Sequence, residues 1–204
     1  MAVILYIETN FLMTVAKGQD PQADNLLKSF PSSVQIVIPS ICCMEALSTL
    51  ENELKYRKRF TKELDLQITQ LKRDKTSLAD KSLLYNLEES KIENQSLLND
   101  LQTRLFDTLS QIATKTEMIE LTADTLQESL ATPRIEKDPT DNLILSCILA
   151  HANLHPTDTK VFLSANINEF GTTEIQEVLR NYGVDKYFTH TQNFLGWLQS
   201  QSTL

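Results

Sequence analysis

Four acidic side chains each follow or open an apolar segment of the sequence. They are Glu8 after AVILYI, Glu45 after IVIPSICCM, Asp141 at the head of DNLILSCILAHA, and Glu169 after KVFLSANIN. If each apolar segment forms a strand or begins a helix, the carboxylates converge at one end of a parallel sheet. Such carboxylates raise one another's pKa and tend to bind a proton or a divalent cation. Oxygen ligands favour Mg²⁺ or Mn²⁺ over zinc, so the sequence predicts a metal site in a phosphate-handling enzyme.

Simpler explanations exist for some of these acids. Glu45 and Asp141, taken alone, are acids in the first turns of helices, where a negative charge is favourable. Helix capping does not account for Glu8, which directly follows a predicted buried strand. Taken together, the four acids therefore favour a shared pocket. Asp138 is close enough in sequence to be a substitute or supporting ligand, but a loop acid before Pro139 is more simply explained as solvated.

The composition indicates one domain, with room for an appendage. The chain has 204 residues, 41% of them hydrophobic, and a net charge of −8. An acidic surface argues against nonspecific coating of a polyanion, although it leaves room for a local basic track. The first residues lack a basic region and a cleavage site, and no apolar segment reaches the roughly 20 residues that span a bilayer. We therefore expect a cytoplasmic protein without a membrane partner.

Strand-like and helix-like segments alternate at both ends of the chain. Predicted strands cover residues 3–7, 34–39, 117–121, 160–164 and 185–189. Predicted helices begin near the caps Thr9 or Asn10 and Ser40, and they cover residues 122–131, about 141–154, 173–182 and the C-terminal segment. This alternation predicts an α/β three-layer sandwich with a central parallel sheet of four or five strands. Three cysteines, two of them adjacent, indicate buried thiols rather than a disulfide scaffold.

The middle of the chain is predicted to be helical. No proline lies between Pro39 and Pro133, and no glycine between Gly18 and Gly171. Two apolar seams are out of phase: Leu64, Ile68, Leu71 and Leu78 with Lys75, then Leu84, Leu87, Leu98, Leu101, Leu105 and Ile112 with Lys91 and Asn94. The phase break favours a turn near residues 77–82 over a skip in one helix, so residues 52–115 form an inserted hairpin within a single domain, 1–204. The polar interruptions either fix the register of the arms or mark solvent exposure.

The predicted hairpin also carries the basic residues. They are Lys55, Arg57, Lys58, Arg59, Lys62, Lys72, Arg73 and Lys75. The first five are candidate RNA-binding residues that guide a phosphate backbone, but a solvated coiled-coil face explains them equally well. His151, His155 and His190 show no metal-ligand spacing and are interpreted as structural or surface residues. Four glycines leave no glycine-rich phosphate loop, which argues against ATP hydrolysis and dinucleotide chemistry.

Four motifs together resemble the PIN domain family, whose members are commonly metal-dependent ribonucleases. They are YIETNFLM, PSICCMEAL, DPTDNLILSCILAHA and VFLSANINEF, in two blocks at residues 1–50 and 117–200. The resemblance implies that Glu8, Glu45, Asp141 and Glu169 hold Mg²⁺ or Mn²⁺, and that Asn166 and Thr9 assist. It implies an endoribonuclease that cleaves RNA phosphodiesters. It further suggests a toxin that binds an antitoxin, and a homodimer.

This sequence departs from the family at three of these positions. The family usually has aspartate where Glu8 stands and often has aspartates at Asn166 and Glu169. The extra methylene of Glu8 extends the side chain by about 1.3 to 1.5 Å. Because Mg²⁺ requires near-ideal geometry, three alternatives follow: a preference for Mn²⁺, weaker metal binding, or a catalytically weakened scaffold that binds RNA or protein through the hairpin. A phosphatase of small phosphoesters is a further, less favoured alternative.

Overall fold

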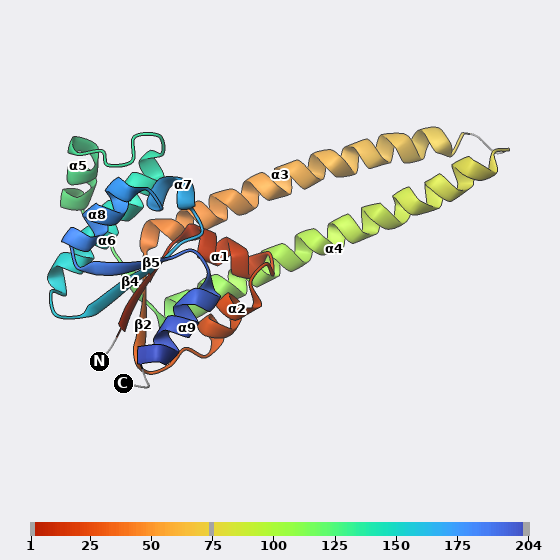
Figure 1. Cartoon of the computed structure of the whole chain (residues 1–204). Helices are drawn as coiled ribbons and strands as arrows, with labels where there is room; N and C mark the ends of the chain where they lie inside the picture. The colour runs from red at the N-terminus through yellow and green to blue at the C-terminus, as the bar shows by residue number, and fades with distance from the viewer. Residues whose placement is uncertain (1–2, 74–75, 202–204) are drawn as a thin grey trace. The chain divides into compact units, whose positions relative to one another are not determined.

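A computed structural model describes residues 3–73 and 76–201, and these residues contain a five-stranded sheet (Figure 1). Its strands are β1 (Val3–Ile7), β2 (Val34–Pro39), β3 (Glu117–Ile119), β4 (Thr159–Leu163) and β5 (Val184–Phe188). The order is β3-β2-β1-β4-β5, and all pairs are parallel. The predicted central parallel sheet is confirmed.

Helices cover both faces of this sheet. On one face lie α1 (Thr9–Ala16), α2 (Pro21–Lys28) and α9 (Thr191–Gln201); on the other lie α5 (Ala123–Ala131), α6 (Pro139–Leu154), α7 (Ile167–Phe170) and α8 (Thr173–Asn181). Right-handed crossovers explain this division. The chain runs from β1 through β2 to β3 at one edge of the sheet, then crosses to β4 and β5, so the later connections lie on the opposite face. Helix α2 packs against α9, and α6 packs against β2, β3 and α5. The three-layer α/β sandwich is therefore confirmed.

The strand order reverses between β1 and β4. In an open parallel sheet, the crevice at the carboxyl ends of such strands is the usual ligand site. Glu8 directly follows β1, and Ser164 directly follows β4. Both central strands are almost wholly buried, which explains their continuous apolar sequence and leaves the polar residues at their ends.

Several helix boundaries differ from the predictions. The N-cap of α1 is Glu8 rather than Thr9 or Asn10, and the N-cap of α6 is Asp138 rather than Thr140 or Asp141. Asp138 accepts hydrogen bonds from the backbone N–H groups of Thr140 and Asp141, so it is not simply solvated. Helices α2 and α7 were not predicted.

The long helices α3 (Ser40–Leu71) and α4 (Leu78–Lys115) confirm the inserted helical hairpin. The chain divides into two compact units. One is Leu47–Arg104, within the hairpin, and the other comprises the residues on either side of it. The division of the chain into one domain with an insertion at 52–115 stays a prediction. The turn begins after Leu71, earlier than the predicted 77–82, and Lys75 lies outside the described residues. Within the described residues, no helix has both the length and the apolar composition needed to cross a bilayer.

The predicted seams are partly confirmed within the hairpin. Leu64, Ile68, Leu98 and Leu101 are buried, whereas Leu78 is 81% exposed and does not belong to a seam. Polar contacts between the arms set their register: Lys72 pairs with Glu88 at 2.8 Å and Lys91 with Asp65 at 2.6 Å.

Asn94 is the buried member of this polar set. Its Oδ1 accepts from Arg57 Nη1 at 3.1 Å, and its Nδ2 donates to Thr61 Oγ1 at 3.0 Å. Both bonds join α4 to α3 at one fixed register. The Asn94 interruption therefore supports the first alternative from the sequence, fixing of register, rather than exposure.

We expect Asn94→Ala to lower the free energy of unfolding by about 1 to 3 kcal/mol, because the half-buried Arg57 and Thr61 lose their buried hydrogen-bond partner. Urea unfolding followed by circular dichroism measures this change. Asn86→Ala, at an exposed position on the same helix, is the matched control. Equal stability of the two variants would contradict a register-fixing role for Asn94.

Candidate active site: an acidic cluster at the ends of β1 and β4

Glu8 is a buried carboxylate at the junction of β1 and α1. Its side chain is 2% exposed, and its Oε2 accepts from the backbone N–H of Asn10 at 2.6 Å. The bond caps α1, and the positive end of the helix favours the negative charge. The second oxygen, Oε1, is buried without a hydrogen-bond partner within the described part of the chain. One carboxylate oxygen of Glu8 is thus left for a cation or a proton.

The surroundings of Glu8 disfavour its charged form. Burial is the largest cause and raises the pKa of Glu8 to about 7. The Asn10 amide and the nearby Ser164 hydroxyl lower this pKa, whereas the negative charges of Asp141 and Glu45 raise it further. Glu8 therefore lies within electrostatic reach of two of the predicted acids.

Asp141 is the second buried acid, in the first turn of α6. Burial raises its pKa to about 7, and the charges of Asp138, Glu45 and Glu169 add to the effect. The amide Nδ2 of Asn166 donates to Asp141 Oδ2 at 2.7 Å and lowers the pKa in part. Asp141 is thus the acid that connects the N-terminus of α6 with both Glu45 and Glu169.

Glu45 and Thr9 form a hydrogen-bonded pair. Thr9 is buried at the first position of α1, and its hydroxyl donates to Glu45 Oε2. Glu45 is half-buried in the second turn of α3. The bond orients one oxygen of Glu45 while the other keeps its acceptor capacity.

The segment after β4 completes the cluster. The backbone N–H of Asn166 donates to Ser164 Oγ at 3.0 Å. The hydroxyl of Tyr187, on β5, donates to the Ser164 carbonyl at 2.8 Å and faces the Asn166 carbonyl at 3.4 Å. Tyr187 thereby fixes the turn that carries Asn166 and, one helical turn later, Glu169. Tyr187 was not among the predicted site residues, because its place in a short strand gives no signal of this contact.

The structure brings the six predicted site residues together at the carboxyl ends of the central strands. They are Glu8, Thr9, Glu45, Asp141, Asn166 and Glu169. Their mutual effects on pKa and the Thr9–Glu45 and Asn166–Asp141 bonds connect all six. The carboxylate oxygens are nevertheless widely spaced. Among the described residues, no three of these acids offer ligand atoms within 4.8 Å of one another; the group that does so lies elsewhere in the fold. Mg²⁺ commonly takes one or two carboxylates and keeps several waters, which suits an open cluster.

These residues fit a hard divalent cation. The carboxylates and the amide offer oxygen donors, which Mg²⁺ and Mn²⁺ prefer. The unpartnered Oε1 of Glu8 is the specific observation, because a buried carboxylate oxygen without a donor is costly unless a cation or proton balances it. The extra methylene of Glu8 is accommodated by its bond to Asn10, which holds the carboxylate at the start of α1.

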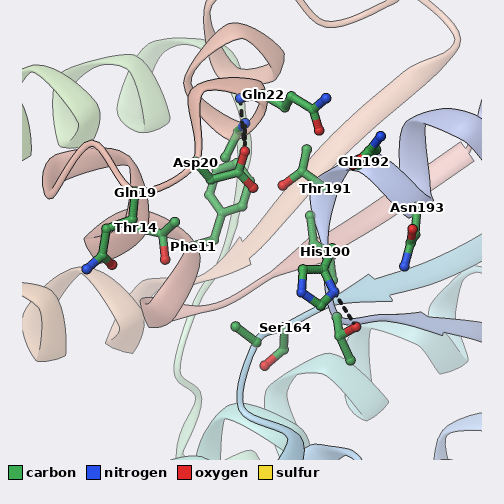
Figure 2. A pocket seen from close by; sticks show the side chains of 14 residues that line it. Phe11, Thr14, Gln19, Asp20, Gln22, Ser164, His190, Thr191, Gln192 and Asn193 are labelled. Atoms are coloured by element: carbon green, nitrogen blue, oxygen red, sulfur yellow. Dashed lines mark hydrogen bonds between the residues drawn. The ribbon is translucent and has the colours of Figure 1, made fainter.

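A hollow of about 570 Å³ lies beside the cluster (Figure 2). Ser164 lines the hollow and lies next to Glu8. The other lining residues come from the end of β4 and the segment after it, α1, the α1–α2 loop, α2, the β5–α9 loop and α9. Many of the side chains that line the hollow are polar, including Gln19, Gln22, His190 and Asn193. The hollow is large enough for a small polar ligand.

Comparison with known proteins identifies the class. The PIN domain family matches residues 5–170, so the chain belongs to the PIN domain family and has a nuclease-like fold. No curated protein and no solved structure matches the chain. The family prediction made from the four motifs is confirmed, whereas the roles of the individual side chains remain proposals.

The candidate RNA-binding residues lie on α3 in the hairpin. Lys58, Arg59 and Lys62 are exposed, but Lys55 pairs with Glu51 at 3.7 Å and Arg57 donates to Asn94. Four of the five basic side chains, including Lys55, are therefore exposed, and Arg57 is the one that bonds to the other arm within the described residues.

A second polar group was not foreseen. Glu117, His151 and His155 offer ligand atoms that lie within 4.8 Å of one another. The statement that the histidines show no ligand spacing is therefore wrong. Positions four apart share one face of a helix, and that spacing was the signal in the sequence.

The raised pKa of Glu8 predicts a stability profile. Between its ordinary value of 4.5 and about 7, the native state binds more protons than the unfolded state, so stability falls as pH rises. In EDTA we expect Glu8→Gln to gain about 3 kcal/mol relative to wild type between pH 4 and pH 8, since the amide needs no ionisation. Unfolding midpoints across this range measure it. Glu120→Gln, at an exposed site, is the control. Parallel profiles for wild type and Glu8→Gln would contradict the perturbed carboxyl.

Proposed function

We propose that the protein is a Mg²⁺- or Mn²⁺-dependent endoribonuclease that cleaves RNA phosphodiesters at the acidic cluster. The buried, unpartnered Oε1 of Glu8 carries the proposal. That oxygen lies at the carboxyl end of β1, within electrostatic reach of Asp141 and Glu45. Family membership supports nuclease chemistry, and the cluster supplies the oxygen donors that this chemistry uses.

Each side chain has a defined task in this proposal. Glu8, Glu45, Asp141 and Glu169 would hold the cation, one or two of them directly and the others through its water molecules. The cation would neutralise phosphate charge and make water a better nucleophile. Thr9 orients Glu45, and Asn166 orients Asp141, through the hydrogen bonds described above. Ser164 lies next to Glu8 and lines the hollow, so it is placed to contact a phosphate or the attacking water.

The hollow beside Ser164 supports a nucleotide as the bound unit. Its volume of about 570 Å³ is in the range of small-ligand sites. Amide side chains such as Gln19, Gln22 and Asn193 can donate to and accept from the edges of a base. Base edges are accessible in this way in single-stranded RNA, where bases are unstacked. We therefore propose single-stranded RNA as the substrate class.

The exposed face of α3 suits the same substrate. Lys58, Arg59 and Lys62 are exposed there, and Tyr56 and Phe60 are 71% and 47% exposed. Basic side chains interleaved with aromatic ones bind single strands by phosphate attraction and base stacking. We propose that this face binds RNA, whether or not the acidic cluster cuts it.

A catalytically weakened scaffold is the second candidate. The Asn166 amide supports it, because a donor occupies Asp141 Oδ2 at 2.7 Å where a carboxylate ligand is expected in the family. In that case, the hairpin face binds RNA or protein and the cluster contributes no turnover. An antitoxin partner and a homodimer remain proposals that rest on the family.

The first experiment compares cleavage of a mixed single-stranded RNA with Mg²⁺, Mn²⁺ or EDTA. We expect metal-dependent cutting that falls at least about 100-fold in Glu8→Gln and in Asp141→Asn, because each removes a metal-binding charge. Glu120→Gln and Asp124→Asn change exposed residues in the same way and serve as matched controls. A chromogenic phosphomonoester tests the phosphatase alternative in the same assay.

Two results would count against the nuclease. Cutting that persists in EDTA, or in both variants, would contradict the acidic site. Binding of RNA without cutting under either metal would favour the scaffold.

A second experiment addresses the α3 face. We expect the double variant Lys58→Glu and Arg59→Glu to weaken RNA binding and to reduce the slope of log K against log salt by about 1.4, or 0.7 for each phosphate that is no longer neutralised. Fluorescence anisotropy over a salt series measures both quantities. The double variant Lys81→Glu and Lys137→Glu makes the same charge change at two other exposed positions. Equal salt slopes in the two double variants would show that net charge, rather than this face, governs binding.

A further inference from the structure

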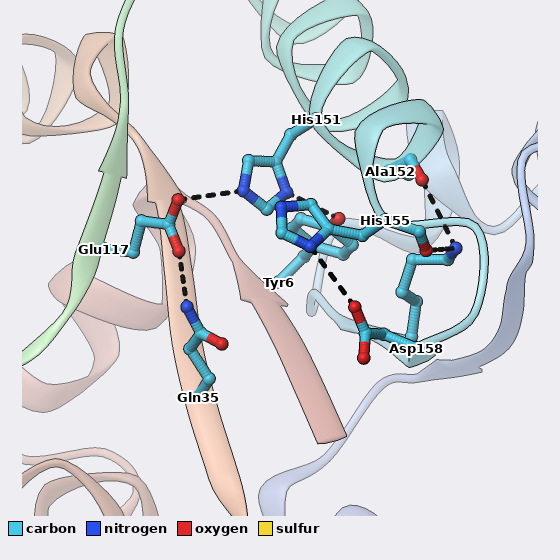
Figure 3. Close-up of polar contacts among 8 residues, drawn as sticks. Tyr6, Gln35, Glu117, His151, Ala152, His155 and Asp158 are labelled. Atoms are coloured by element: carbon cyan, nitrogen blue, oxygen red, sulfur yellow. Dashed lines mark hydrogen bonds and ion pairs between the residues drawn. The ribbon is translucent and has the colours of Figure 1, made fainter. Parts of the chain in front are cut away.

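Glu117, His151 and His155 form a group that the proposed nuclease does not use (Figure 3). Glu117 is the first residue of β3, His151 lies in the last turn of α6, and His155 is the C-cap of α6. Asp141 lies ten residues before His151 on α6, a rise of about 15 Å, so the group is separate from the acidic cluster.

The helix places the two imidazoles together. Their four-residue spacing brings them to one face, where the rings stack with centroids 4.4 Å apart and an interplanar angle of 23°. Glu117 Oε1 lies 3.0 Å from His151 Nε2. Two nitrogens and one carboxylate oxygen thus meet between β3 and the end of α6.

Each of the three side chains is held by a further partner. The Tyr6 hydroxyl lies 2.9 Å from His151 Nδ1, and Asp158 Oδ2 lies 3.2 Å from His155 Nδ1. Gln35 Nε2 donates to Glu117 Oε2. When Nδ1 of each ring carries the proton, Nε2 keeps its lone pair. Metal-binding histidines show this arrangement, in which the second nitrogen donates to a carboxylate or another oxygen.

The end of α6 is anchored beneath the group. Lys160 is 1% exposed, and its Nζ donates to the Ala152 carbonyl at 3.3 Å and to the His155 carbonyl. These bonds satisfy carbonyls at the helix C-terminus, where a positive charge is favourable. Gly183 leaves room for this lysine, because a Cβ there would lie 3.0 Å from Nζ. His155 is therefore fixed through its backbone while its side chain stays half-exposed.

We propose that Glu117, His151 and His155 form a second metal site, for a divalent transition metal of the Zn²⁺ type. Two imidazoles and a carboxylate with one open position are a known zinc donor set. Ligand atoms around tetrahedral zinc lie about 3.3 Å apart, given bonds of 2.0 to 2.1 Å. The Glu117–His151 pair is already at 3.0 Å, and the third atom, within 4.8 Å, needs a shift of about 1.5 Å at most. Rotation of the half-exposed His155 ring supplies it.

A plain Glu117–His151 ion pair is the competing explanation. It accounts for one contact but leaves the stacked His155, with its own Asp158 partner, without a role. The ion pair alone predicts no bound metal. The histidine group and the acidic cluster also differ in the metal they favour, because nitrogen ligands select zinc or cobalt, whereas oxygen ligands select Mg²⁺ or Mn²⁺. Excess Mg²⁺ therefore separates the two sites in an experiment.

The test is equilibrium dialysis of the full chain with Zn²⁺ in excess Mg²⁺, together with the visible spectrum of the Co²⁺ form. We expect one Zn²⁺ per chain and the strong absorption of a four-coordinate Co²⁺ site. His155→Gln and Glu117→Gln should each weaken Zn²⁺ binding about 10-fold or more and abolish the Co²⁺ band. His190→Gln removes the third histidine of the chain and should change neither.

His155 and Glu117 are partly exposed, so their variants are expected to fold, and circular dichroism verifies this. Asp141→Asn should retain the Zn²⁺ site even where RNA cleavage fails, which separates this inference from the proposed nuclease. No stoichiometric Zn²⁺, or equal binding by folded His155→Gln and wild type, would overturn the proposal.

Discussion

The buried carboxylate of Glu8 is the constraint on which the site depends. The parallel sheet brings it to the point where the strand order reverses, and α1 begins on its Oε2. Removing the group from water is unfavourable, and the Asn10 amide offsets part of that cost. The remaining oxygen must meet a proton or a cation, and Asp141 and Glu45 add negative charge nearby. The Glu8 side chain therefore caps α1 with one oxygen and leaves the other for a proton or a cation.

The sequence predicted the sheet well because its physical signal was strong. Strands such as β1 and β4 are buried on both faces, so their residues form continuous apolar segments. The same reasoning placed Glu8 and Glu169 after strands at one sheet edge. It failed for the cap of α1, because glutamate is not among the preferred N-cap residues and Thr9 is. The single turn of α7 is too short to show a helical period.

Other features depended on distant contacts that a single sequence does not reveal. The apolar seams predicted two arms, but the position of their turn and the exposure of Leu78 depended on the partner helix. Asn94 looked like an interruption and is instead bonded to Arg57 and Thr61. Glu117 and His155 are far apart in sequence, and the packing of α6 against β3 brings them together. Periodicity thus predicts which face is buried, whereas topology decides which polar groups meet.

Helix α6 carries Asp141 in its first turn and His151 in its last, with a continuous hydrogen-bonded backbone between them. A helix of this length is stiff, so the two ends are held about 15 Å apart. If Mn²⁺ binds at the acidic end, α6 holds a paramagnetic ion at a fixed distance from the two imidazoles at its other end. Mn²⁺ at the acidic end would broaden the nuclear resonances of the two imidazoles by an amount set by that separation. The broadening of the imidazole resonances would then report the occupancy of the acidic end, without any attached label.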